Sequence, residues 1–340
     1  MVSAPSVCRP GHFAPCRYTT RAAAAKLSFV FEHDLRGAML ATPDSRLASR
    51  SIPWRALPRR ATHAAGDGGL RAAIDARHPC VLDDFSADWP ALERWTPERL
   101  AERFGDRRVR VYDASFGTPG RGYMGSIDTM RFDDFLAATL GEGRDLRMFL
   151  YNLAHQIPEL VDDLSLPDVG LRFSRNFVFS FFGSRGSTTP LHFDIDMGCV
   201  VHTVISGRRR IRLFPPEDAD ALYRHPCTVR SYVPLDAPDP DRYPAFELAQ
   251  GYEVTLSAGE SLFMPPGWWH EFHYLEAGMG VSLRAPSPRL ADRLAGARNL
   301  LVTSPVDRVA NAVAPRAWYA WKCRRADARA TARLQRTAVS

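Results

Sequence analysis

Two side chains of metal-ligand type stand two positions apart in residues 188–194, which read Thr-Thr-Pro-Leu-His-Phe-Asp. In a β-strand, residues two positions apart point to the same face, so His192 and Asp194 can reach one ion. An imidazole together with a carboxylate suits a first-row divalent metal. The pattern therefore predicts that these two side chains form part of a metal site.

The third ligand must come from another part of the chain, and His270 is the best candidate. It ends the segment Phe-Met-Pro-Pro-Gly-Trp-Trp-His at residues 263–270, where the Pro-Pro-Gly turn would present it at the start of a strand. Two histidines and one carboxylate leave the opposite positions of the metal open, as in the facial triad of non-haem iron(II) oxygenases. Those positions would let a 2-oxo acid chelate and dioxygen bind, whereas a structural zinc site would be closed by four protein ligands.

Two neighbours of this triad have other expected roles. Asp196 shares the predicted face of His192 and Asp194 and could replace Asp194 as the ligand, but we expect it to lie outside the coordination sphere. His202 should face inward on the next strand. We expect it to line the pocket, because a fourth protein ligand would close the site.

Short strands separated by turn residues must position the triad. From residue 176 to residue 286 the sequence shows eight apolar or alternating runs, a pattern typical of a barrel or sandwich. The runs are 177–182, 191–196, 199–205, 208–214, 252–256, 261–264, 270–275 and 280–284. Residues 176–286 are therefore the predicted β-core that carries the metal site.

The segments before and after this core differ from it. The sequence of residues 67–175 predicts a mixed α/β region. In it, a helix should begin with Thr96 as its N-cap and Pro97 as its first residue. Residues 287–340 predict helices whose aromatic residues pack on the body or on a second copy. Residues 1–66 are rich in Ala, Arg, Pro and Ser and lack periodicity, so we expect a disordered or leader segment.

Composition excludes some classes of function. The net charge of +6 lies mainly at the two ends of the chain, since no acid precedes Glu32 and residues 316–340 hold seven basic residues and one acid. A nucleic-acid partner is therefore not favoured. No apolar run approaches the roughly 20 residues that span a membrane. The six cysteines form no Cys-x-x-Cys pair, which favours thiols in a reducing cytoplasm.

Residues 75–286 resemble the JmjC/cupin-like oxygenases, especially the asparaginyl hydroxylase type that acts on hypoxia-inducible factor. Besides the triad segments, the resemblance includes Trp89-Pro90, Leu213-Phe214-Pro215-Pro216, Gly251-Tyr252-Glu253 and the last core strand. It implies a mainly β fold, with a double-stranded β-helix core of the jelly-roll or cupin type, the α/β N-terminal region and C-terminal helices. It also implies Fe(II) held by His192, Asp194 and His270, with 2-oxoglutarate and O2 as cosubstrates.

The resemblance further implies how 2-oxoglutarate is held. Arg209 matches the basic residue that binds its distal carboxylate, and Thr189 matches a hydroxyl beside it. Arg284 on the last core strand is the alternative anchor, because some other 2-oxoglutarate oxygenases bind the cosubstrate from that region. Where the family has a tyrosine for the same carboxylate, this chain has Phe149, which cannot donate a hydrogen bond.

Strand alternation also helps to choose between Arg209 and Arg284 as the anchor of 2-oxoglutarate. Arg209 shares a face with Ile211 and Leu213, and this face should point into the barrel. The arginines on the other face, Arg208, Arg210 and Arg212, should point to solvent. A planar guanidinium on the inner face can grip a carboxylate through two parallel hydrogen bonds.

The expected activity is hydroxylation of a C–H bond in a protein or peptide side chain. Two alternatives remain open: a hydroxylase of a small metabolite, and a metal-binding cupin module without catalysis. We expect a cytoplasmic protein with no membrane partner. Because enzymes of the family often pair through C-terminal helices, a homodimer is expected through residues 287–340.

Overall fold

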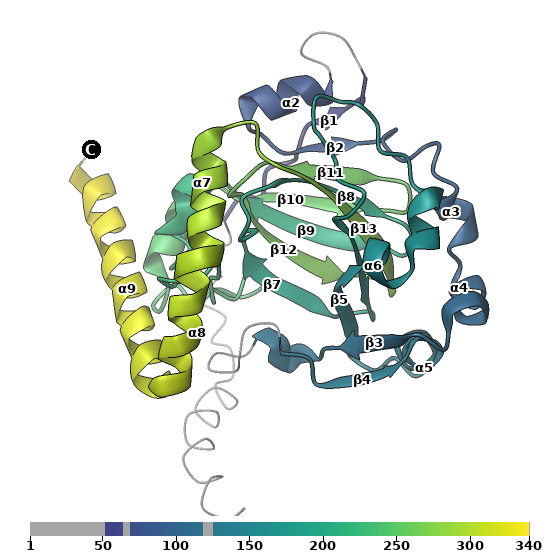
Figure 1. The fold of residues 1–340 in the computed structure, drawn as a ribbon. Coiled ribbons are helices and arrows are strands. Elements are labelled where there is room, and N and C mark those ends of the chain that lie inside the picture. The colour runs from purple at the N-terminus through teal and green to yellow at the C-terminus, as the bar shows by residue number, and fades with distance from the viewer. Residues whose placement is uncertain (1–51, 64–68, 118–124, 340) are drawn as a thin grey trace, which may run out of the picture. The chain divides into compact units, whose positions relative to one another are not determined.

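The structure is a computed structural model that describes residues 52–63, 69–117 and 125–339 (Figure 1). Its strands are β1 (Arg59–Arg60), β2 (Cys80–Leu82), β3 (Arg108–Val111), β4 (Asp128–Arg131), β5 (Arg147–Asn152), β6 (Val178–Gly183), β7 (Thr188–His192), β8 (Cys199–Val204), β9 (Arg209–Phe214), β10 (Tyr252–Leu256), β11 (Ser261–Met264), β12 (Trp269–Tyr274) and β13 (Gly278–Ala285). They form a seven-stranded sheet in the order β1-β2-β11-β8-β13-β6-β5, a four-stranded sheet in the order β10-β9-β12-β7, and the pair β3-β4.

The last eight strands, β6 to β13, form the core and belong to two sheets. Strands β6, β8, β11 and β13 join the larger sheet, whereas β7, β9, β10 and β12 make the smaller one. Neighbouring core strands are antiparallel throughout. This arrangement confirms the expected double-stranded β-helix, and every one of the eight predicted runs overlaps one of these strands.

One predicted strand is shorter than its sequence pattern. The run at 191–196 stops at His192, where β7 ends. Met197 has a φ of 53° and its N–H donates to the carbonyl of Asp194 at 3.1 Å, so residues 194–197 form a turn. Asp194 is thus brought to its place by this turn and not by strand alternation.

The helices lie outside the two sheets. They are α2 (Leu70–Ala76), α3 (Ala91–Arg94), α4 (Pro97–Phe104), α5 (Phe132–Leu136), α6 (Leu153–Gln156), α7 (Leu290–Arg298), α8 (Ser304–Val313) and α9 (Pro315–Val339). The Thr96 side chain caps α4 by accepting from the N–H of Arg99 at 3.3 Å, as predicted. Helices α7 to α9 lie together beside the β-core (Figure 1). Within the described ranges, no helix is long and apolar enough to cross a membrane.

The prediction for residues 1–66 is wrong for residues 52–63. Strand β1 pairs in parallel with β2, and the side chains of Ile52 and Leu57 are buried. The N–H of Arg55 donates to the carbonyl of Gly251 at 2.9 Å, which ties this segment to the smaller sheet. The pattern was missed because a two-residue strand has no periodicity to detect. Residues 1–51 and 64–66 lie outside the described residues.

This N-terminal segment also explains a second difference. Arg212 was expected in solvent, but its side chain is only 9% exposed. Its guanidinium lies 4.6 Å from the centroid of the Trp54 ring and donates to Glu253 at 2.8 Å and to Asp236 at 2.7 Å. Arg208 on the same face is exposed, as predicted. Residues 52–57 therefore cover part of the outer face of the smaller sheet.

Candidate metal centre

The two histidines of the predicted triad face each other across neighbouring strands. His192 on β7 is the register partner of His270 on β12, and their ring centroids lie 4.3 Å apart. The Nδ1 atom of His192 lies 2.8 Å from the carbonyl oxygen of Pro190, and that of His270 lies 3.0 Å from the carbonyl oxygen of Trp268. Each Nδ1–H therefore donates to the backbone, which leaves each Nε2 lone pair free for a ligand.

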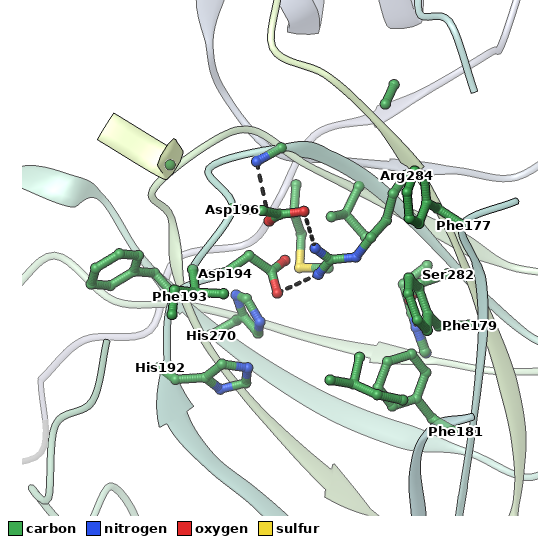
Figure 2. Close-up of a pocket in the computed structure, with 18 of the residues that line it drawn as sticks. Phe177, Phe179, Phe181, His192, Phe193, Asp194, Asp196, His270, Ser282 and Arg284 are labelled. Carbon is green, nitrogen blue, oxygen red and sulfur yellow. Dashed lines mark hydrogen bonds and ion pairs between the residues drawn. The ribbon is translucent and has the colours of Figure 1, made fainter. Parts of the chain in front are cut away.

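Asp194 completes the group from the turn that follows β7. Its carboxylate and the two imidazoles offer ligand atoms that all lie within 4.8 Å of one another (Figure 2). Among the residues whose placement is described, no other three His, Cys, Asp or Glu side chains come together in this way. The structure therefore brings together all three of the predicted metal ligands.

The ionisation states of these residues match a site for a divalent cation. Burial, and then the nearby His270, lowers the pKa of His192 to about 3, and burial also lowers the pKa of His270. Both imidazoles are thus neutral near pH 7. Burial is the largest influence on Asp194 and alone would raise its pKa, but the charge of Arg284, the two histidines and a hydrogen bond from Arg284 together hold that pKa below its usual range. Neutral imidazoles and an ionised carboxylate are the forms that bind metals.

Arg284 is engaged by the acidic residues of this centre. It forms an ion pair with Asp194, and its Nη1 donates to Asp196 at 2.7 Å (Figure 2). Asp196 therefore contacts an arginine and does not belong to the group of three ligand-type residues. Because both terminal nitrogens of Arg284 already contact carboxylates, this side chain is poorly disposed to bind a cosubstrate.

Arg209 occupies a different environment at another part of the same cavity. Its side chain is 1% exposed, and it donates to His202 Nε2 at 2.9 Å and to the carbonyls of Gly278 at 3.1 Å and Phe181 at 3.5 Å. The guanidinium also lies 4.4 Å from the centroid of the Tyr274 ring. No carboxylate in the described part of the chain forms an ion pair with it. A buried cation is thus held by neutral groups only.

His202 is the main neutral partner, and sequence reasoning predicted only that it would line the pocket. Burial, followed by the charge of Arg209, lowers its pKa well below the ordinary value, so the ring is neutral. Since Nε2 accepts from Arg209, Nδ1 carries the proton and donates to Ser282 Oγ at 2.9 Å. Ser282 and Tyr274 were missed, although their alternation with neighbouring inward residues could have indicated them.

A cavity of about 830 Å³ joins these groups. Its lining includes the triad, His202, and the predicted cosubstrate residues Thr189, Arg209 and Arg284. Its opposite wall is aromatic, with Phe177, Phe179 and Phe181 facing the metal ligands (Figure 2). Phe149 also lines the cavity, and its ring packs edge-on against Phe181. One cavity therefore contains the group of three ligand-type residues, an apolar wall, and a buried arginine that has no ion-pair partner in the described ranges.

Comparison with known proteins shows which chains this one is similar to. A family model described as the cupin-like domain matches residues 69–284. Lysine-specific demethylase 8 of Xenopus tropicalis is 29% identical over 213 residues, which cover 60% of this chain and 47% of that protein. HSPB1-associated protein 1 homolog of Danio rerio is 32% identical over 218 residues, which cover 56% of this chain and 48% of that protein.

A third relative is covered more fully. The tRNA wybutosine-synthesizing protein 5 of Danio rerio is 29% identical over 237 residues, which cover 63% of this chain and 70% of that protein. The chain spans about half the length of the two relatives named before it.

Proposed function

Since the chain belongs to the cupin-like domain family, we propose that it is an Fe(II)- and 2-oxoglutarate-dependent oxygenase that hydroxylates a C–H bond. Family membership also confirms the resemblance to the JmjC/cupin-like oxygenases. One observation carries the proposed reaction class. The His192, Asp194 and His270 group shares its cavity with a buried arginine that, within the described ranges, has no carboxylate partner. Such a cavity suits a metal together with an anionic chelator.

The donor set fits iron(II). Two neutral imidazoles and one carboxylate give three protein ligands, which would leave coordination positions for 2-oxoglutarate and dioxygen. Iron at this site would activate dioxygen, so that 2-oxoglutarate is oxidised to succinate and CO2 and one oxygen atom enters a substrate C–H bond. The surrounding phenylalanines exclude water from the site and leave room for an apolar substrate group.

Arg209 is the proposed anchor for the distal carboxylate of 2-oxoglutarate. A guanidinium has five N–H donors. Among the residues that the structure describes, the Nε–H of Arg209 has no hydrogen-bond partner and Nη1 donates only to His202, so donors remain for a carboxylate. Thr189 lines the same cavity and offers a hydroxyl. Arg284 is a positioning residue in this proposal, because its contacts with Asp194 and Asp196 orient the carboxylate ligand.

The proposed substrate is a protein or peptide side chain. Two of the relatives are named for a lysine-specific demethylase and a protein associated with HSPB1, which supports a protein substrate. A third relative is named for wybutosine synthesis in tRNA, so the family name alone does not fix the substrate. A small-metabolite hydroxylase and a non-catalytic metal-binding module remain the alternatives.

The test of the reaction class needs no known substrate. Full-length protein is incubated with Fe(II), 2-oxoglutarate and O2, and succinate is measured in the absence of a prime substrate. Wild-type protein should form succinate slowly, and the His270→Ala variant should form none. Iron binding without any succinate would instead support the non-catalytic module. A screen of peptides, ribosomal proteins and metabolites by mass spectrometry would then look for the gain of one oxygen atom.

We also propose that a second copy pairs through the C-terminal helices. Val306, Val309 and Val313 on α8 are 47–79% exposed and are spaced three and four residues apart, which places them on one helix face. A contiguous apolar face of this kind marks an interaction surface. Light scattering should give a dimer mass for the wild type and a monomer mass for Val309→Glu/Val313→Glu. A control at exposed Arg316, changed to Glu, should stay dimeric.

A further inference from the structure

Two arginines at the edge of the main cavity have no partner within the described residues. Arg172 precedes β6 and Arg293 lies on α7, and both line the cavity while exposed to solvent. No hydrogen bond or ion pair of either guanidinium is found there. Phe177 and Leu300 also line the cavity and are 55% and 47% exposed. We call these four residues the rim.

The charge at the rim would persist when the site is loaded. The cavity lining includes four arginines and two aspartates, and both aspartates pair with Arg284. A divalent metal and the dianion 2-oxoglutarate would cancel each other's charge. Arg172 and Arg293 therefore keep an unbalanced positive field around the opening, which attracts anions.

Behind the rim, the passage to the metal centre is apolar. Phe179 and Phe181 occupy alternate positions of β6, face the triad across the cavity and continue the apolar lining that begins with Phe177 at the rim (Figure 2). A pocket of this kind binds an apolar group, while a few polar residues at its edge orient the ligand. The site thus combines an apolar interior with a cationic rim.

A cationic side chain is the main alternative occupant, because aromatic faces attract cations. However, Arg284 already lies 5.8 Å from the centroid of the Phe179 ring. The two rim arginines would repel a second cation, and like charges brought together at an interface strongly disfavour a partner. The distribution of charge therefore disfavours a lysine or arginine side chain.

We infer that the site takes an acidic peptide segment with an apolar side chain at its centre. The apolar side chain would enter between the phenylalanines, and carboxylates on flanking residues would contact Arg172 and Arg293. These two arginines come from separate elements and stand in solvent, so the flanks of an extended chain reach them better than one small acid does. The inference rests on the proposed function for the reaction, but selection at the rim is a property of binding alone.

The test uses three peptides of equal length, each with a central leucine and flanks of glutamate, glutamine or lysine. Their binding to the full chain, loaded with Mn(II) and 2-oxoglutarate, is measured by calorimetry at low and high salt. The glutamate peptide should bind about ten-fold more tightly than the glutamine peptide at low salt, with the lysine peptide weakest. Arg172→Glu/Arg293→Glu should abolish or reverse this order. The matched control Arg144→Glu/Arg324→Glu changes two exposed arginines outside the rim and should keep it.

The outcomes separate this inference from the proposed function. Equal binding of the three peptides, absence of binding, or an order that the rim variant leaves unchanged would overturn the inference. A single-stranded RNA that binds through the rim arginines, when the glutamate peptide does not, would also overturn it. Succinate formation without substrate is measured in the same variants. Its absence in the wild type would count against the proposed reaction alone, because peptide binding at the rim does not require turnover.

Discussion

Two regions of one cavity each contain a buried arginine, but the two arginines differ in whether carboxylates neutralise them. Near the metal ligands, Arg284 is neutralised by Asp194 and Asp196. At the other region, Arg209 is more deeply buried, and its contacts among the described residues are His202, backbone carbonyls and the Tyr274 ring. An isolated buried charge costs several kcal/mol. The difference supports the proposal that Arg284 orients the protein's own carboxylates, whereas Arg209 binds an anionic ligand.

The largest expected effect concerns the metal ligands themselves. Replacing His192, Asp194 or His270 by alanine should remove iron binding and reduce turnover by at least about 100-fold, because each is one of the three proposed protein ligands. Iron content and succinate formation measure this. Asp196→Ala is the control and should keep iron near the wild-type ratio. Loss of iron in that control, with retention in Asp194→Ala, would assign the carboxylate ligand to Asp196.

The second-largest effect is expected when Arg209 is replaced. Arg209→Ala should raise the Michaelis constant for 2-oxoglutarate about 30-fold or more while iron still binds, since losing a buried charged partner costs about 2–5 kcal/mol. Arg208→Ala should change it little, because that side chain is exposed on the other face. The comparison of the two regions fails if Arg284→Ala gives the large effect and Arg209→Ala does not.

A smaller and different effect is expected at Arg284. Arg284→Gln should lower turnover about ten-fold through a less well oriented Asp194, and it should change the Michaelis constant for 2-oxoglutarate by less than about three-fold. Steady-state kinetics on iron-saturated protein distinguish the two constants. A larger change in the Michaelis constant than in turnover would show that Arg284 contacts the cosubstrate.

Changes at the outer face of the smaller sheet should affect stability and have the smallest effect on catalysis. Deleting residues 1–51 should leave thermal stability unchanged. Deleting residues 1–63 should lower the free energy of unfolding by about 2–5 kcal/mol, because the buried Ile52 and Leu57 are lost. Thermal unfolding of both proteins measures this. The shorter deletion should also keep wild-type affinity for 2-oxoglutarate. A fully stable protein after the longer deletion would mean that residues 52–63 contribute little to the fold.

Residue type and spacing predicted most of the β-core and the ligand triad. They did not predict the turn that places Asp194 or the contact that Arg284 makes with it. The triad was predictable because His-x-Asp and a Pro-Pro-Gly-Trp-Trp-His segment each carry a local signal. The position of Asp194 arises from a turn, which strand alternation does not describe. The pairing of Arg284 with Asp194 joins residues 90 positions apart. Such contacts depend on strand order in three dimensions and leave no trace in local periodicity.

The place of β7 in its sheet has a consequence for local unfolding. β7 is the last strand of the smaller sheet, with β12 as its strand partner, and an isolated bridge to Arg230 supports its end. It carries His192 and leads directly into the Asp194 turn, whereas His270 lies on the inner neighbour. A bound metal would therefore cross-link an edge strand to an interior one. By thermodynamic linkage, occupancy of the site would make opening of β7 less favourable and protect its backbone amides from solvent exchange more than those of β9.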